Sequence, residues 1–135
     1  MNLDAVMTEV AGRLETIAGL RVFDHPVDKL TPPTAIVSLP EIAFDETYGR
    51  GSDRYTLPVV LAVGKMNDRA SRANLAPYVA GAGPSSVKEV LEDETVPYVA
   101  FDGLRVVSVD FDVVAWGAIP YLTATFVLDI MGDGA

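Results

Sequence analysis

Apolar residues near the start of the chain recur with the spacing of one helix face. The positions that repeat every three or four residues are Leu3, Val6, Met7, Val10, Leu14 and Ile17. The polar residues Glu9, Arg13 and Glu15 fall mostly on the opposite face, which is the pattern of a surface helix. Asn2 can cap the start of this helix, and Gly19 stands where a helix ends. The pattern predicts an amphipathic first helix.

Short strand-forming runs dominate the next part of the chain. Leu20 to Phe23 and Thr34 to Leu39 are apolar or β-branched, and the Thr31-Pro32-Pro33 corner between them cannot be helical, because each proline biases the preceding residue away from the α region. Glu41 to Thr47 and Arg54 to Val63 are expected to form the arms of a long hairpin.

The tip of this hairpin is flanked by glycines and carries both signs of charge. It reads Tyr48-Gly49-Arg50-Gly51-Ser52-Asp53-Arg54, and the glycines can adopt positive φ at little cost. Pro58 has no N–H group, which predicts that its arm is an edge strand or contains a bulge. An edge strand can extend a sheet across subunits.

Two helices and two long strands complete the predicted elements. Asn67 to Val79 favours a helix, and Ser86-x-x-Glu89 matches a capping box that starts a short one. In the first long strand Val107, Val109, Phe111 and Val113 alternate with Ser108, Asp110 and Asp112, so one face is expected to be buried and the other solvated. In the second strand Leu122, Ala124, Phe126, Leu128 and Ile130 share a face. The short connector at 117–120 makes the pair antiparallel.

These elements predict one α+β domain over residues 1–135. We expect a mostly antiparallel sheet of about four to five strands, with helices packed on one face and a long protruding hairpin. No linker or internal repeat divides the chain. The last four residues, 132–135, are expected to form a frayed tail.

Composition narrows the range of functions. Half of the 135 residues are apolar, which excludes general disorder, and no apolar run approaches the roughly 20 residues of a membrane span. The chain has no cysteine, so it can form neither a disulfide nor a thiolate site. Its net charge of −9 makes it a poor candidate for binding phosphate backbones.

The residues that could take part in catalysis or metal binding are better explained as ordinary solvent-exposed side chains. His25 is the single imidazole and stands in a turn beside Asp24, where zinc would lack sufficient nitrogen or sulfur ligands. Asp110 and Asp112 point the same way from one strand, yet alternation reserves those positions for solvent. The two Gly-x-Gly sequences lack the Gly-Lys-Ser/Thr ending of a phosphate-binding loop. We expect no catalytic residue, no cofactor and no metal ion, and therefore no enzymatic activity.

Interaction with another protein is the better expectation for the exposed residues. A tip with mixed charge suits complementary pairing with a partner, although a plain solvated loop explains it nearly as well. Trp116 and Tyr121 suit an interface anchor, and packing at a sheet corner is an equally good interpretation. The candidate interface residues are Tyr48, Arg50, Asp53, Arg54, Pro58, Trp116 and Tyr121.

The order of these features resembles the tail terminator (tail-completion) proteins of long-tailed bacteriophages with non-contractile tails. The resemblance covers nearly the whole chain. It rests on the Leu30-Thr31-Pro32-Pro33 corner, the tip at 48–54, Leu57 to Val63 before a helix, Ser85-Ser86-Val87, and the Ala115-Trp116-Gly117 and Tyr121-Leu122-Thr123-Ala124 segments of the closing hairpin.

This resemblance implies a structural protein of the virion, assembled in the host cytoplasm. It implies a six-membered ring at the head-proximal end of the tail tube, which stops tube polymerisation and meets the head–tail connector. DNA would pass through the lumen without specific binding, and no membrane is involved. Two alternatives remain open: another neck or tail component, such as a head-closure adaptor or a tube subunit, and a small ligand-binding α+β domain. The last predicts a pocket that gathers His25, Asp110 and Asp112.

Overall fold

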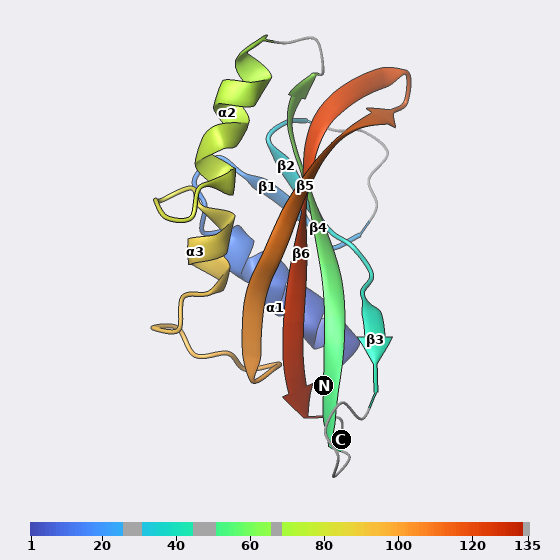
Figure 1. The fold of residues 1–135 in the computed structure, drawn as a ribbon, viewed down its shortest axis with the longest axis vertical. Coiled ribbons are helices and arrows are strands. Elements are labelled where there is room, and N and C mark those ends of the chain that lie inside the picture. Colours follow the sequence, from blue (N-terminus) through green and yellow to red (C-terminus); the bar gives the residue numbers. More distant parts are fainter. Residues whose placement is uncertain (26–30, 45–50, 66–68, 134–135) are drawn as a thin grey trace.

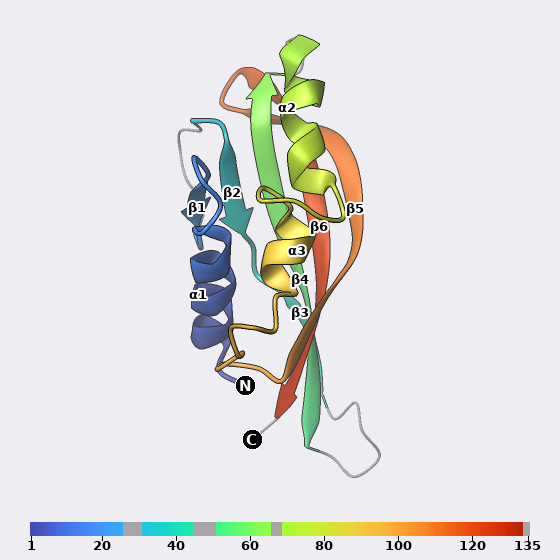
Figure 2. The ribbon, with the colours of Figure 1, turned by 90° about the vertical axis from the view of Figure 1, so that its left-hand side faces the viewer.

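Six strands form one twisted sheet in the described part of the chain, and helices cover one of its faces (Figures 1 and 2). The computed structural model describes residues 1–25, 31–44, 51–65 and 69–133. The strands are β1 (Arg21–Phe23), β2 (Thr34–Val37), β3 (Glu41–Ala43), β4 (Ser52–Lys65), β5 (Gly103–Trp116) and β6 (Ile119–Asp133). The helices are α1 (Leu3–Leu14), α2 (Arg69–Val79) and α3 (Val87–Leu91). The predicted α+β class is confirmed, with six strands instead of the expected four to five.

The order of strands across the sheet is β1-β2-β4-β6-β5, and β3 also pairs with β4. The β1–β2 pair is parallel, and the other pairs are antiparallel. β4 is therefore an interior strand, so the expectation that Pro58 marks an edge strand is wrong. The register irregularity of β4 against β6 lies between Ala62 and Gly64, away from the proline.

The position of Pro58 explains how an interior strand tolerates it. The Pro58 carbonyl accepts a hydrogen bond from the Ser38 N–H at 3.0 Å. The missing N–H of Pro58 faces the same side, because both backbone groups of a residue in an antiparallel strand point to one neighbour. Pro58 lies opposite Ser38, between the end of β2 at Val37 and the start of β3 at Glu41, so its missing N–H costs only the reciprocal bond to Ser38 at the end of the β2–β4 pairing.

The main core lies between the sheet and the helix layer. α1 begins as predicted, with the Asn2 side chain accepting a hydrogen bond from the Ala5 N–H at 3.0 Å. The predicted core face of β6 is confirmed from Ala124 to Ile130. Side chains with no more than 2% exposure fill this core: Val6, Val10, Leu14, Leu57, Val59, Leu61, Leu91, Phe126, Leu128 and Ile130.

A second, smaller cluster lies on the opposite face of the sheet. Ile36, Ala62 and Tyr121 are buried there, and Trp116 packs against them. Figure 1 shows that the loop end of the β5–β6 hairpin bends away from α2. Alternation along β6 places Tyr121 on the face opposite to Leu122 and Ala124, and Trp116 packs against the cluster there.

The short helix α3 starts with half of the predicted capping box. The Ser86 hydroxyl accepts a hydrogen bond from the Glu89 N–H at 3.2 Å. The Glu89 carboxylate does not return to Ser86; it accepts a hydrogen bond from the Gly83 N–H at 2.6 Å. Glu89 thereby ties the start of α3 to the loop that precedes it.

The end of the chain differs from the expected frayed tail. β6 continues to Asp133, and Gly132 is buried and pairs with Asp53 of β4. Residues 134–135 lie outside the described residues. Among the described helices, none combines the length and the apolarity that crossing a bilayer requires.

Candidate assembly surface

From Val107 onward, β5 exposes three of the four apolar side chains that alternation predicts to be buried. Val107 is 48% exposed, Phe111 is 55% exposed and Val113 is 43% exposed. The prediction of a buried face is therefore wrong for Val107, Phe111 and Val113, whereas Val109 is partly buried against the main core. α3 packs on β5, whereas α2 packs on β4 and β6, and the hairpin bends away from the helix layer (Figure 1).

The outer edge of β5 is covered near its start and open farther along. Near its start, the Val106 N–H donates to the Glu92 carboxylate of the α3 C-cap at 2.9 Å, so this part of the edge is covered. A register irregularity follows between Val106 and Ser108. Farther along, the Val113 N–H donates at 2.7 Å to the carboxylate of the adjacent Asp112, outside the β5–β6 ladder. The N–H and C=O groups of Phe111 face the same open side, because the backbone groups of alternate residues in a strand point in the same direction.

Two carboxylates stand beside these apolar residues on the other face of the strand. Asp110 and Asp112 are exposed, as alternation predicts. We call Asp110, Phe111, Asp112 and Val113 the β5 edge surface. Charged residues on an open strand discourage nonspecific pairing, so a partner for this surface must complement the carboxylates as well as the apolar side chains.

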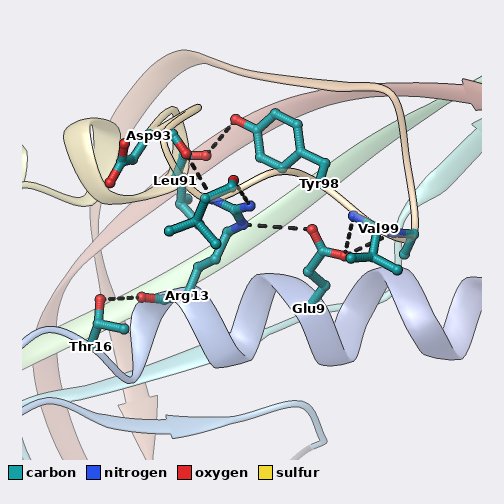
Figure 3. Close-up of polar contacts among 9 residues, drawn as sticks. Glu9, Arg13, Thr16, Leu91, Asp93, Tyr98 and Val99 are labelled. Carbon is teal, nitrogen blue, oxygen red and sulfur yellow. Dashed lines mark hydrogen bonds and ion pairs between the residues drawn. The ribbon is translucent and has the colours of Figure 1, made fainter.

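A buried arginine fixes a second group of exposed apolar residues. Arg13 of α1 is 9% exposed, and its guanidinium donates to the carbonyls of Asp93 at 3.0 Å and Val96 at 2.6 Å (Figure 3). The guanidinium also lies 4.2 Å from the centroid of the Tyr98 ring. Arg13 lies on the polar face of α1, as predicted, but a loop packs over that face and buries the arginine.

Glu9 completes this attachment of the loop at 93–100. Its carboxylate lies 3.6 Å from the Arg13 Nε and accepts hydrogen bonds from the N–H groups of Val99 at 3.0 Å and Ala100 at 2.8 Å (Figure 3). The Tyr98 hydroxyl donates to the Leu91 carbonyl at 2.8 Å, and burial raises the pKa of this tyrosine while Arg13 opposes the rise. Val96 and Val99 remain 58% and 91% exposed on a loop anchored at both ends.

Sequence reasoning missed this network, although one signal for it was present. Glu9 and Arg13 are four residues apart, a spacing that places both on one side of a helix. The loop that covers them is 80 residues away in the sequence, so its position depends on the tertiary fold.

The candidate interface residues of the hairpin separate in the structure. Tyr48 and Arg50 lie outside the described residues. Asp53 is 8% exposed, and the Arg54 Nε lies 3.0 Å from an Asp129 carboxylate oxygen on the neighbouring strand. Asp53 and Arg54 are thus part of the sheet, where the sequence predicted a solvated tip. Their role in docking, like that of Pro58, Trp116 and Tyr121, stays a prediction.

The residues that a ligand-binding domain would bring together are far apart. His25 follows β1, and its Nδ1 lies 3.1 Å from the adjacent Asp24 carboxylate. Asp110 and Asp112 lie on β5, at the opposite end of the strand order. The described residues contain no group of three or more His, Cys, Asp or Glu side chains placed to hold a metal ion. The predicted pocket that gathers these three residues is not formed.

Comparisons with known proteins give a structural neighbour. No protein-family model matches the sequence, and no curated protein matches it. The fold is similar to that of a chain in the solved structure described as the virion of a native gene transfer agent particle, with a TM-score of 0.60 and 14% sequence identity. The alignment covers 96% of each chain. At this identity the likeness establishes a shared fold.

Proposed function

We propose that the chain is a structural protein of a phage-like virion, and more specifically a tail terminator. The observation that carries the proposal is the fold shared with a virion chain over 96% of both chains. The sequence resemblance to tail terminators supports the finer assignment.

The exposed surfaces suit a protein that functions by assembly. The β5 edge surface joins an open strand edge to uncovered apolar side chains, and Val96 and Val99 protrude from an anchored loop. Single exposed apolar residues need no explanation, but apolar side chains that cluster on an open sheet edge are typical of protein–protein contacts. We infer no enzymatic activity and no cofactor.

In this proposal six copies form a closed ring at the head-proximal end of the tail tube. The ring stops polymerisation of the tube protein and presents its other side to the head–tail connector, and DNA passes through its lumen. A ring requires two different, complementary patches on each copy, because a heterologous contact repeats around the rotation axis until it closes. The net charge of −9 per copy keeps passing DNA from adhering.

The test uses electron microscopy and native mass spectrometry of the purified protein. The protein is measured alone and after mixing with growing tail tubes of the same virion. We expect a discrete six-membered ring that binds one end of each tube and stops elongation. Open-ended polymers of this chain would favour a tube subunit. A ring that binds connectors but leaves tube length unchanged would favour a head-closure adaptor. A strict monomer that binds neither would refute a structural role in the virion.

A further inference from the structure

The β5 edge surface needs a partner that is both cationic and apolar. It combines two carboxylates, Asp110 and Asp112, with Phe111 and Val113, all exposed. The molecule as a whole is strongly acidic, so most of the surface of a second copy would repel these carboxylates. A second copy can dock here only through a locally positive patch.

The outer face of α2 is such a patch. The helix reads RASRANLAPYV and contains no acidic residue, and Arg69 and Arg72 on it are exposed. In the described part of the chain, neither arginine forms an ion pair with a carboxylate. Both arginines lie in the first turns of the helix, where the helix dipole disfavours cations. They therefore do not stabilise α2 itself, and an external partner is a better explanation for them.

The outer face of α2 also carries small apolar residues between its charges. Ala73 and Ala76 are exposed beside the arginines, so the face between the charges is low and apolar. Phe111 and Val113 project from one face of β5 and the two aspartates from the other, so a partner at this edge meets the carboxylates on one side of the strand and the apolar side chains on the other. Figure 2 shows α2 in the helix layer and β5 at the margin of the sheet.

We propose that the β5 edge surface of one copy binds the outer face of α2 of a second copy, with Asp110 and Asp112 opposite Arg69 and Arg72. This inference rests on the proposed ring and identifies its two complementary patches. Since the patches differ, each copy uses one of them toward each neighbour, and the contact repeats in one direction. The apolar residues supply affinity, and the charges set the register.

Charge-reversal variants that are assayed separately and then mixed provide the test. One variant carries Asp110→Arg and Asp112→Arg; the other carries Arg69→Asp and Arg72→Asp. Each variant alone places like charges at every contact, so we expect its association constant to fall at least tenfold. In an equimolar mixture every contact between unlike variants is again complementary. We expect the mixture to regain rings of alternating copies, measured by mass photometry at fixed concentration.

Controls separate this contact from general charge effects and from misfolding. Glu15→Arg with Glu94→Arg changes the net charge as much as the first variant at two other exposed positions, and should assemble like the wild type. Thermal unfolding verifies that each variant is folded. If the variant with Asp110→Arg and Asp112→Arg does not fold, the milder Asp110→Asn, Asp112→Asn variant replaces it. We expect this milder variant to lower the association constant at least threefold.

Three results would overturn the proposal. Reversal variants that assemble like the wild type, or a mixture that stays dissociated while wild-type rings form, would refute this contact and leave the proposed function intact. A wild-type protein that never assembles would refute the ring and the contact together.

Discussion

At the scale of single residues, Arg13 contributes most to the order of the surface. Its guanidinium links α1 to the loop at 93–100 through two carbonyls, one aromatic ring and Glu9. A buried charge with this many partners holds a loop in one conformation, whereas a surface ion pair contributes little. Val96 and Val99 are presented on a fixed loop for this reason.

We expect Arg13→Met to lower the free energy of unfolding by about 2–4 kcal/mol, because Glu9 and two carbonyls lose their partner in a buried site. Urea unfolding measures this change, and hydrogen exchange should show faster exchange at Val99 and Ala100. Arg21→Met removes an exposed arginine and serves as the control, with an expected change below about 0.5 kcal/mol. Equal losses in both variants would show that the burial of Arg13 does not matter.

Glu92 connects α3 to the covered part of the β5 edge. Burial opposes its ionisation, but hydrogen bonds from Lys88 and the Val106 N–H, with the charges of Lys88 and Arg105, outweigh burial and lower the pKa of this carboxyl. A carboxyl with a lowered pKa stabilises the fold in its ionised form. That contribution is complete at neutral pH and is lost as the pH falls through the lowered pKa.

Glu92→Gln should therefore cost about 1 kcal/mol of stability at pH 7. The difference between wild type and variant should shrink as the pH falls below about 4, since the wild-type carboxyl then becomes protonated. Urea unfolding at several pH values measures both quantities. Glu94→Gln changes an exposed carboxyl of the following loop and should show neither effect. A difference that stays constant with pH would contradict an ionised role for Glu92.

At the scale of elements, the packing of α2 on β4 depends on one glycine. A Cβ atom built on Gly64 would collide with the hydroxyl of Ser71, which is buried and donates to the Lys65 carbonyl at 2.9 Å. Gly64 also lies at the register irregularity between β4 and β6. The close contact fixes how near α2 approaches the sheet.

Gly64→Ala should destabilise the protein by about 1–3 kcal/mol, because either α2 moves outward or Ser71 rotates and loses its hydrogen bond. Thermal unfolding measures the loss, and adding Ser71→Ala should restore part of it. Gly12→Ala is the matched control: Gly12 lies within α1 with open space around its Cβ position, so this change should stabilise the protein by about 0.5–1 kcal/mol. Equal effects at both glycines would exclude a special contact at Gly64.

The elements also show which features a sequence pattern can predict. α1, the β5–β6 hairpin and the Ser86 cap follow from local periodicity and capping, and all three are confirmed. Local patterns do not indicate which neighbour covers a strand. The pattern therefore predicts an edge strand at Pro58, although β1 and β5 end the strand order, and a core position for Phe111, although its side chain is 55% exposed. Arg13 was missed for the same reason, since the two carbonyls that its guanidinium binds lie 80 and 83 residues away.

At the scale of the whole molecule, the two-layer architecture and the acidic charge act together. Helices cover one face of the sheet, and among the described residues the apolar cluster on the other face is the small one around Tyr121. Asp110 and Asp112 are exposed on that second face of β5, and Asp129 pairs there with Arg54. A ring of such copies brings many negative charges into a small volume, so it should repel a polyanion at every subunit.

We expect the assembled protein to show no measurable binding to duplex DNA even at 50 mM salt, where electrostatic binding would be strongest, because no counterions are released when two anionic surfaces meet. Fluorescence anisotropy of a labelled 20-base-pair duplex measures this, with a basic DNA-binding protein as the positive control. The Glu15→Arg, Glu94→Arg variant shifts the net charge from −9 to −5 and is expected to assemble like the wild type, so it provides an intact ring of lower negative charge for comparison. Binding by the wild type that weakens as salt is added would show instead that cations line the lumen, and would reverse the proposed role of the acidic charge.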